Sequence, residues 1–295
     1  MHIGPTAIDD TFAEAFRMWY ARLIVTAFDD YWLDAVLREF CGYSTSIIAC
    51  DCEAGVEQRL AEFDTPDGRP GAAVLVFGFS AEALAKVLLN RTGQCLMTCP
   101  TTAVYDGLPG AAVRVPLGKS LRYFGDGYQK SKLLGSRRYW RIPVMDGEFL
   151  VEESAGVEKG IGGGNIILQA TSLPIGLAAV RRGAEALSRL PGVITPFPGG
   201  VARSGSKIGS KYKGLRASTA DAFCPTLRSR VETKLLPGAH CVYEIVIDGV
   251  SEEAVGAAIA AAARQAAGEG VLAITAGNYG GKLGKFQFQL RKVLA

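Results

Sequence analysis

Apolar positions in the first half of the chain form short continuous runs and longer segments with helical spacing. Short apolar runs typical of strands cover residues 21–27, 46–50, 72–77 and 94–98. Helical patterns follow the first and third of these, over 29–40 and from Ser80 to about residue 90. Asp10 to Glu14 also have the character of a helix start, with Asp10 or Thr11 as the cap. The predicted order is β-α-β-β-α-β.

The same order returns in the second half. Strands are predicted at 165–171, 193–195, 241–248 and 271–276, with helices at 174–189 and after Ser251. The segment 77–80 before one helix corresponds to 248–251 before the other. We therefore predict an α+β fold of two tandem ferredoxin-like lobes, at 1–150 and 151–295. Residues 114–153, rich in Tyr, Gly and basic residues, are expected to form hairpins or an arm within the first lobe.

Glu244 interrupts the apolar strand at 241–248. Alternation places His240, Val242, Glu244 and Val246 on one face of this strand. A carboxyl group between two valines loses hydration, which raises its pKa and suits it to donate a proton near neutral pH. The alternative is a structural role, in which Glu244 pairs with a lysine or arginine or lies on a solvated face.

Composition limits the classes of function. The 295 residues are 48% hydrophobic and 21% charged, and the net charge of +3 is too small for a typical nucleic-acid-binding protein. The most apolar run, 255–267, contains Arg264 and is too short to span a membrane. No early segment has the pattern of a secretory signal. We expect a soluble, cytoplasmic protein that binds neither nucleic acid nor membrane.

Cysteine and histidine argue against several kinds of site. The seven cysteines lack the paired spacing of zinc sites, and only two histidines exist, so we expect free thiols, no metal and no His-dependent triad. The glycine cluster at 277–282 has Leu283 where a P-loop needs Ser or Thr, and the cluster at 160–165 precedes a strand instead of following one. Neither ATP nor NAD is expected.

A glycine-rich, basic loop at 196–218 is the strongest candidate for ligand binding. It contains the doublet Gly205-Ser206-Lys207 and Gly209-Ser210-Lys211. Such glycines let the backbone approach a ligand, and hydroxyl and ammonium groups suit carboxylate or phosphate. The alternative is a flexible, solvated loop. Polar residues at 93–101 and 124–129 are weaker candidates, and Gly125-Asp126-Gly127 is also typical of a turn.

Together, the motifs resemble formylmethanofuran:tetrahydromethanopterin formyltransferases over nearly the whole chain and in the same order. The matching runs are residues 10–16, 65–71, 93–95, 124–129, 196–200, 206–211, 217–219, 241–247 and 276–284. The resemblance implies formyl transfer between methanofuran and N5 of tetrahydromethanopterin in C1 metabolism. Both coenzymes would be substrates, with no permanently bound cofactor. It also implies an active site in a cleft at a subunit interface and a proton-handling role for Glu244.

The candidate coenzyme-binding residues come from these motifs. They are Ser206, Lys207, Gly209, Ser210, Lys211, Ser218, Thr219, Asn165, Asn278, Lys282, Gln94, Asp126 and Tyr128. The basic loop would hold the acidic groups that both coenzymes carry, and its hydroxyl or backbone N–H groups would stabilise charge on the formyl oxygen.

The assembly and two other functions stay open. Archaeal relatives of this kind form homo-oligomers and are often strongly acidic. This basic, alanine-rich chain is similar to bacterial members that work within a formyltransferase/hydrolase complex. We therefore expect a homo-oligomer, dimer or tetramer, or a subunit of that complex. The alternative functions are a non-catalytic, cofactor-holding or structural subunit, and a general binder of polyanions.

Overall fold

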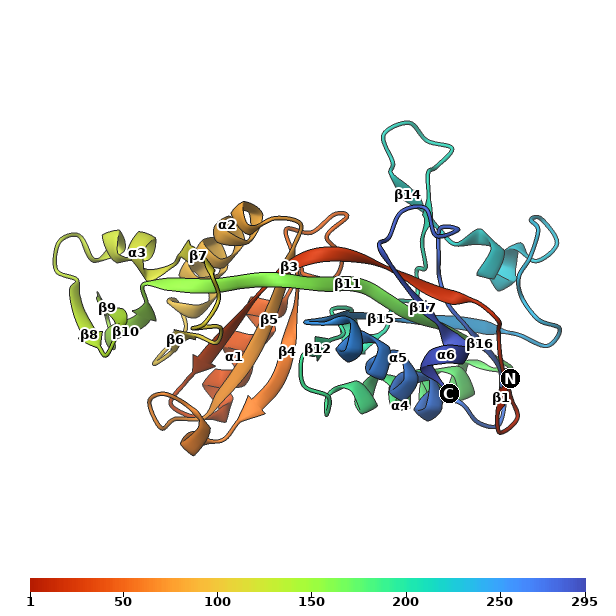
Figure 1. Ribbon diagram of the computed structural model, residues 1–295, viewed down its shortest axis with the longest axis horizontal. Helices are drawn as coiled ribbons and strands as arrows, with labels where there is room; N and C mark the ends of the chain where they lie inside the picture. Colours follow the sequence, from red (N-terminus) through yellow and green to blue (C-terminus); the bar gives the residue numbers. More distant parts are fainter. The chain divides into compact units, whose positions relative to one another are not determined.

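The computed structural model describes residues 1–295 and contains two compact units (Figure 1). One, here called the middle unit, is Arg17–Gly160. The other, here called the terminal unit, combines Met1–Phe16 with Ile161–Ala295. The division therefore differs from the predicted lobes 1–150 and 151–295. The reason is that two long strands, β3 (Phe12–Thr26) and β11 (Ser154–Ala170), each contribute residues to both units.

The middle unit has the predicted β-α-β-β-α-β order. Its elements are residues 17–26 of β3, α1 (Asp30–Cys41), β4 (Glu53–Leu60), β5 (Gly71–Gly78), α2 (Ala81–Arg91) and β6 (Ala103–Asp106). The sheet order is β4-β5-β3-β6 with antiparallel neighbours, which is the ferredoxin-like arrangement. Asp29 and Ser80 cap the two helices, because their side chains accept the backbone N–H groups of Trp32 and Ala83.

The predicted hairpins follow β6. Strands β8 (Lys130–Leu134), β9 (Arg137–Val144) and β10 (Gly147–Glu152) form an antiparallel meander, and β10 runs parallel to β6. Before them come β7 (Val113–Pro116), paired with residues 154–157 of β11, and α3 (Gly118–Leu121). Short η1 (Glu62–Asp64) and η3 (Arg122–Gly125) are 3-10 turns.

The terminal unit repeats the order. Its elements are residues 161–170 of β11, α4 (Leu173–Leu187), β12 (Val193–Ile194), β15 (Cys241–Gly249), α5 (Glu252–Ala266) and β16 (Val271–Thr275). The sheet order β12-β15-β11-β16 matches that of the middle unit strand for strand. The structure thus confirms the duplication and the α+β fold.

The remaining elements of the terminal unit extend this core. Strand β2 (Thr6–Ile8) runs parallel to β16 and pairs with β1 (His2–Ile3), while β17 (Phe286–Gln289) pairs with the start of β3 and leads into α6 (Leu290–Val293). The long connection from β12 to β15 holds a hairpin and three 3-10 turns. These are β13 (Lys207–Ile208), β14 (Ala217–Ser218), η4 (Pro198–Gly200), η5 (Asp221–Phe223) and η6 (Pro225–Leu227).

Helices α4 and α5 cover one face of the terminal unit's sheet (Figure 1). Alternation sends Ile245 and Ile247 of β15 and Ile166 and Leu168 of β11 into this core, where all four are fully buried. The packing is close: a Cβ at Gly176 would lie 2.6 Å from Cys241 Sγ. The opposite face of the same strands is therefore the one available to Glu244.

Three local predictions are wrong. Residues 10–14 do not start a helix but lead into β3, whose first residues pair with β17. Residues 46–50 form turns, in which Ala49 and Cys50 both donate to the carbonyl of Ser46. Residues 94–96 belong to a π-helical turn, η2 (Thr92–Leu96), that continues α2, and residues 97 and 98 form a turn. The actual strands are β4 and β6, and short apolar runs could not distinguish them from their neighbours.

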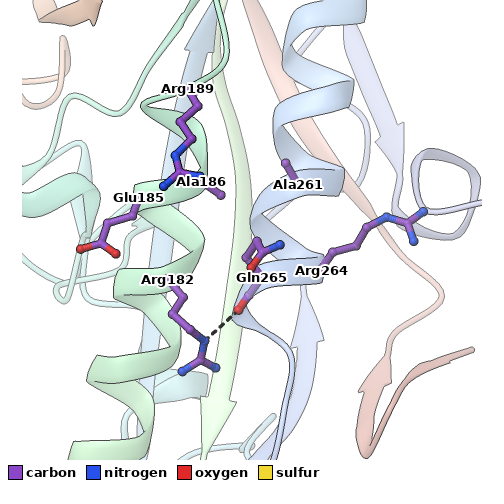
Figure 2. A pocket seen from close by; sticks show the side chains of 7 residues that line it. All are labelled: Arg182, Glu185, Ala186, Arg189, Ala261, Arg264 and Gln265. Atoms are coloured by element: carbon purple, nitrogen blue, oxygen red, sulfur yellow. Dashed lines mark hydrogen bonds between the residues drawn. The ribbon is translucent and has the colours of Figure 1, made fainter.

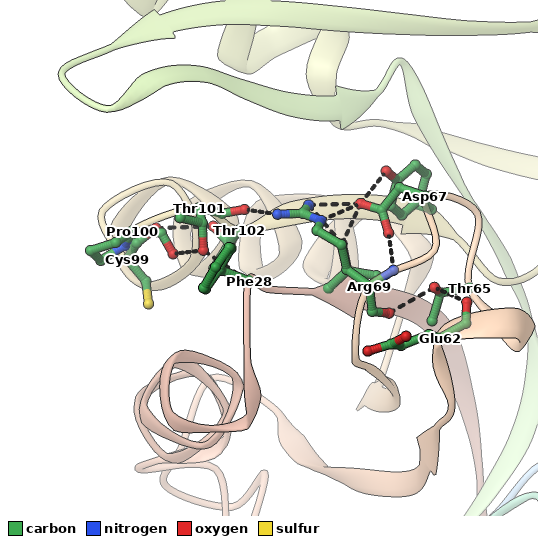
Figure 3. Close-up of polar contacts among 11 residues, drawn as sticks. Phe28, Glu62, Thr65, Asp67, Arg69, Cys99, Pro100, Thr101 and Thr102 are labelled. Atoms are coloured by element: carbon green, nitrogen blue, oxygen red, sulfur yellow. Dashed lines mark hydrogen bonds and ion pairs between the residues drawn. The ribbon is translucent and has the colours of Figure 1, made fainter.

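The loop before β5 is fixed by a polar network around Asp67 (Figure 3). Asp67 accepts hydrogen bonds from Arg69, Thr26 and Tyr105, and Arg69 also donates to the carbonyl oxygen of Thr101. Burial alone would raise the pKa of Asp67, but these hydrogen bonds hold it below its ordinary value. The motif at 65–71 therefore has a structural explanation within the middle unit.

The seven cysteines are free thiols, of which Cys52 and Cys241 are buried. No helix is long and apolar enough to cross a membrane.

Candidate functional site

Glu244 lies in the middle of β15 on the face away from α4 and α5. Its backbone pairs on one side with Ala202, through N–H to O distances of 3.0 and 2.8 Å, and on the other side with Ile167 of β11. Ile167 in turn pairs with Thr275 of β16. Side chains of paired residues point to the same face, so Glu244, Ile167 and Thr275 form one row across the sheet.

Glu244 is partly buried and forms no ion pair or hydrogen bond through its carboxyl group. Burial raises the pKa of this carboxyl from 4.5 to about 7. The salt bridge to a neighbouring lysine or arginine that the structural alternative expects is not present within this chain. A carboxyl that is partly protonated near neutral pH can both donate and accept a proton.

The loop 277–284 lies beside this row and is held by two buried polar residues. Asn165 accepts the N–H of Gly277 at 2.6 Å and donates to its carbonyl at 3.2 Å. Glu14, only 1% exposed, accepts four backbone N–H groups of the loop. These come from Tyr279, Gly281, Leu283 and Gly284 at distances of 2.5 to 2.9 Å. Burial raises the pKa of Glu14, but the four bonds outweigh it and hold the pKa below its ordinary value.

Glu14 and Tyr279 are residues that the sequence prediction missed. The ring of Tyr279 packs against Phe16 with centroids 6.1 Å apart. Burial raises the pKa of Tyr279, the negative charge of Glu244 raises it further, and Ser206 opposes both. Glu14 carried the same signal as Glu244, an acid between apolar neighbours in a strand, but the run was interpreted as a helix start.

The basic loop forms its own small structure. Ser218 donates to the carbonyl of Gly209 at 2.7 Å, and Ser210 accepts the N–H of Tyr212 at 3.1 Å. Lys207 forms an ion pair with Asp221, with Nζ 2.6 Å from the carboxylate. Lys207 is therefore already neutralised, whereas Lys211 is exposed and has no ion pair.

The other predicted binding residues fall into two groups. In the terminal unit, the amides of Asn165 and Asn278 are engaged with the backbone, Asn278 with Phe12 at 3.1 Å, while Lys282 is exposed. Thr219 Oγ1 lies 3.4 Å from Cys224 Sγ.

In the middle unit, three predicted binding residues are exposed. Gln94 lies in the π-helical turn η2, an element that is frequent at functional sites. Asp126 has a left-handed φ of 49° and Tyr128 is 78% exposed.

The middle unit shows which residue the duplicated fold carries at the position that corresponds to Glu244. In the middle unit, Ile24 pairs with Ala73 on one side and with Tyr105 on the other. These positions correspond to Ile167, Glu244 and Thr275 of the terminal unit. Ala73 is 2% exposed, so the fold itself requires no carboxyl group at this place.

A surface pocket of about 510 Å³ lies between α4 and α5, lined mainly by charged residues (Figure 2). Its lining residues are Arg182, Glu185, Ala186, Arg189, Ala261, Arg264 and Gln265. Arg182 donates to the carbonyl of Gln265 at 3.1 Å. The pocket is on the helical side of the sheet and so is separate from Glu244.

Comparison with known proteins gives full-length matches. The family model described as formylmethanofuran-tetrahydromethanopterin formyltransferase matches residues 1–144, and the model of the proximal lobe of the same family matches residues 147–293. The formylmethanofuran–tetrahydromethanopterin formyltransferase of Methylococcus capsulatus is 53% identical over 299 residues, covering 100% of both chains. One subunit of the formyltransferase/hydrolase complex of Methylorubrum extorquens is 45% identical, over 97% of this chain and 95% of the relative.

Solved structures agree. The formyltransferase of Methanosarcina barkeri superposes with a TM-score of 0.95 at 43% identity, over 99% of this chain and 100% of that one. The formyltransferase/hydrolase complex of Methylorubrum extorquens, solved with methylofuran, contains a chain with a TM-score of 0.94 and 44% identity, over 98% and 96% of the two chains.

Proposed function

The chain belongs to the formylmethanofuran–tetrahydromethanopterin formyltransferase family, and on that premise we propose that Glu244 is the general acid–base residue of its reaction. The enzyme moves a formyl group between formylmethanofuran and N5 of tetrahydromethanopterin in C1 metabolism. Both coenzymes are substrates. The observation that carries the role of Glu244 is its unpaired, partly buried carboxyl with a pKa of about 7.

The chemistry requires a group of this kind. The attacking amine forms a bond to the formyl carbon and gives a tetrahedral intermediate, which collapses when the bond to the other nitrogen breaks. The departing nitrogen needs a proton, and the attacking nitrogen must lose one. A neutral Glu244 supplies the first proton and, as a carboxylate, accepts the second, so protons balance over one turnover.

The coenzyme-binding residues are part of the same proposal. Lys211 and Lys282 are exposed and have no ion pair, so they are available for the acidic groups of a coenzyme. Ser206 and Ser210, with the backbone of Gly209, suit hydrogen bonds to the formyl oxygen or to polar groups. Lys207 contributes only if it leaves Asp221, and Asn165 and Asn278 act by holding loops in place. Ser218 holds Gly209 in the same way.

Thr219 and the residues of the middle unit complete the proposed set. Thr219 follows the β13–β14 hairpin, and its hydroxyl contacts Cys224. Gln94, Asp126 and Tyr128 present exposed polar or aromatic groups that suit a heterocyclic coenzyme.

The assembly of the chain and its location in the cell are also part of the proposal. The similarity to a component of a formyltransferase/hydrolase complex supports assembly into such a complex, and a homo-oligomer is the other arrangement. Size-exclusion chromatography of the purified chain, alone and with its complex partners, distinguishes the two. A cytoplasmic location is supported by seven free thiols, which persist in a reducing compartment, and cell fractionation tests it.

The test is formyl transfer between the two coenzymes, followed by absorbance, for the wild type and for Glu244→Gln. A matched control is Glu269→Gln, because Glu269 is an exposed glutamate of the same unit. We expect a loss of about a hundredfold or more for Glu244→Gln, the usual size of an acid–base contribution, and none for the control. Equal activity in all three proteins would remove Glu244 from the mechanism. No activity in the folded wild type, with or without partners, would favour a non-catalytic, cofactor-holding subunit.

A further inference from the structure

Two amide side chains of β11 flank the row that contains Glu244. Asn165 and Gln169 lie two residues either side of Ile167, so all three side chains leave the sheet on the face away from α4 and α5. The two amide residues are buried, with 6% and 2% of their surfaces exposed. Because Ile167 pairs with Glu244, each amide stands about 7 Å along the strand from the row of that carboxyl.

Each amide holds the backbone of a different loop. Asn165 holds the loop 277–284 through both polar groups of its first residue. Gln169 donates from Nε2 to the carbonyl oxygen of Lys234 at 3.0 Å, and its Oε1 accepts the N–H of Leu236 at 2.9 Å. The loop held by Asn165 and the segment held by Gln169 therefore form two walls on the face that carries Glu244.

The backbone of Lys234 is fixed, whereas its ammonium group has no polar partner. Its N–H donates to the carbonyl oxygen of Ala222 at 2.9 Å, and the next residue, Leu235, is buried. The side chain of Lys234 is exposed, and its Nζ lies 5.9 Å from the ring centroid of Phe223 without an ion pair or hydrogen bond. The structure therefore presents a cation from a rigid segment, with all its hydrogen-bonding capacity available to a ligand.

We propose that Gln169 positions Lys234 at this wall, where the ammonium group binds a carboxylate or phosphate of one coenzyme. Lys282 lies on the opposite wall, so the two lysines frame the candidate site from its two ends. This rests on the proposed function, because it concerns the substrates of the same site. Gln169 itself touches no substrate and acts through Lys234.

The position of Lys234 determines which kinetic constant it affects. Its backbone is bound by a side chain two residues along β11 from the row of Glu244, so it meets a part of the coenzyme away from the formyl carbon. Contacts made there are the same in the ground state and in the transition state. Losing such a contact raises KM and leaves kcat unchanged.

The experiment measures kcat and the KM of each coenzyme in formyl transfer for the wild type, Lys234→Met, Gln169→Leu and the double variant. The matched control is Lys292→Met, because Lys292 is an exposed lysine of α6, a helix bound to α5 through Arg264 on the other side of the sheet. We expect Lys234→Met to raise the KM of one coenzyme about tenfold, the size of one charge-assisted hydrogen bond. The KM of the other coenzyme, kcat and the control should stay at wild-type values.

Two further readouts separate binding from a structural effect. The rise in KM for Lys234→Met should shrink in high salt, which screens exposed charges. Gln169→Leu should raise the same KM and speed hydrogen exchange at residues 233–236. The double variant should be no worse than Lys234→Met, because the amide acts only through the lysine.

The proposal is overturned if Lys234→Met leaves both KM values unchanged, raises both equally, or lowers kcat instead. Multiplicative losses in the double variant would remove the positioning role of Gln169. If Gln169→Leu does not fold, Lys234→Met decides alone, because its side chain is exposed. An unaffected Lys234→Met beside an inactive Glu244→Gln leaves the proposed function intact, whereas an active Glu244→Gln removes the role of Glu244 whatever Lys234→Met does.

Discussion

Replacing Glu244 with glutamine should make the protein more stable at alkaline pH and leave its stability nearly unchanged in acid. Glutamine has the shape of a protonated glutamate but cannot ionise. The wild-type carboxyl is partly buried with no ion pair, so its charged form is disfavoured in the folded state. The variant removes that penalty and nothing else.

The size and sign of this change in stability follow from the pKa of Glu244. The carboxyl titrates at about 7 in the folded state against an ordinary value of 4.5. Between these values the folded protein holds a proton that the unfolded chain has lost, so stability falls as pH rises. The contribution is fully present below pH 4.5 and is lost as pH rises through 7. Each unit of difference between the folded and unfolded pKa corresponds to about 1.4 kcal/mol. The wild type should therefore lose about 3 kcal/mol of unfolding free energy that the variant keeps.

The assay must report on the correct unit. Trp19, Trp32 and Trp140 are the only tryptophans, and all three lie in the middle unit, so intrinsic fluorescence would miss Glu244. Urea unfolding followed by far-UV circular dichroism from pH 4 to pH 9, with hydrogen exchange of residues 241–249 at each pH, measures the terminal unit. Protein concentration is kept constant because assembly would also shift stability.

We expect the unfolding free energy of Glu244→Gln to exceed that of the wild type by an amount that grows between pH 4.5 and 7 and is constant above pH 7. A difference that does not change with pH would mean that Glu244 has an ordinary pKa in the folded protein. A wild type that gains stability over the variant as pH rises would mean that an unseen positive partner holds the carboxylate. Either result would refute both the burial argument and the proton-donor role.

Other predictions concern contacts outside the reacting groups. Glu14→Gln should destabilise the terminal unit by about 3 kcal/mol and speed hydrogen exchange at 279–284, since an amide offers one acceptor oxygen where four N–H groups converge. Asp67→Asn should cost the middle unit about 1–3 kcal/mol, and tryptophan fluorescence during urea unfolding is the suitable measurement there. Asp221→Asn should free Lys207, lower KM for the more acidic coenzyme and hardly change Tm, because the ion pair is exposed.

Sequence reasoning found those elements whose signals are local. Asp29, Ser80 and Ser251 were all expected at or beside helix starts, and each caps a helix in the structure. The alternation at 241–248 likewise gave the correct faces of β15, with Ile245 and Ile247 buried against helices. Side-chain caps and alternation depend on neighbours within a few residues, so they can be read from one sequence.

The elements that were missed depend on distant partners. Residues 12–15 extend β3 because they pair with β17, more than 270 residues later in the chain. Strand β4 is polar and contains an irregularity between Val56 and Gln58, which breaks its alternation. The contacts of Glu14 and Tyr279 have the same origin, because their partners are brought together only by the sheet of the terminal unit.

Comparing the two lobes gives the strongest reason to regard Glu244 as functional. In the middle unit the corresponding position is apolar: Ala73 pairs with Ile24, and Tyr105 and Tyr139 pack over the same face with ring centroids 6.0 Å apart. In the terminal unit the same place holds a carboxyl that makes no ion pair and costs about 3 kcal/mol above neutral pH. A sheet that is stable with alanine at this position gains nothing in folding from glutamate. This difference supports the proposed role of Glu244, because amine exchange at a formyl carbon calls for a proton donor and a pKa near 7 suits one.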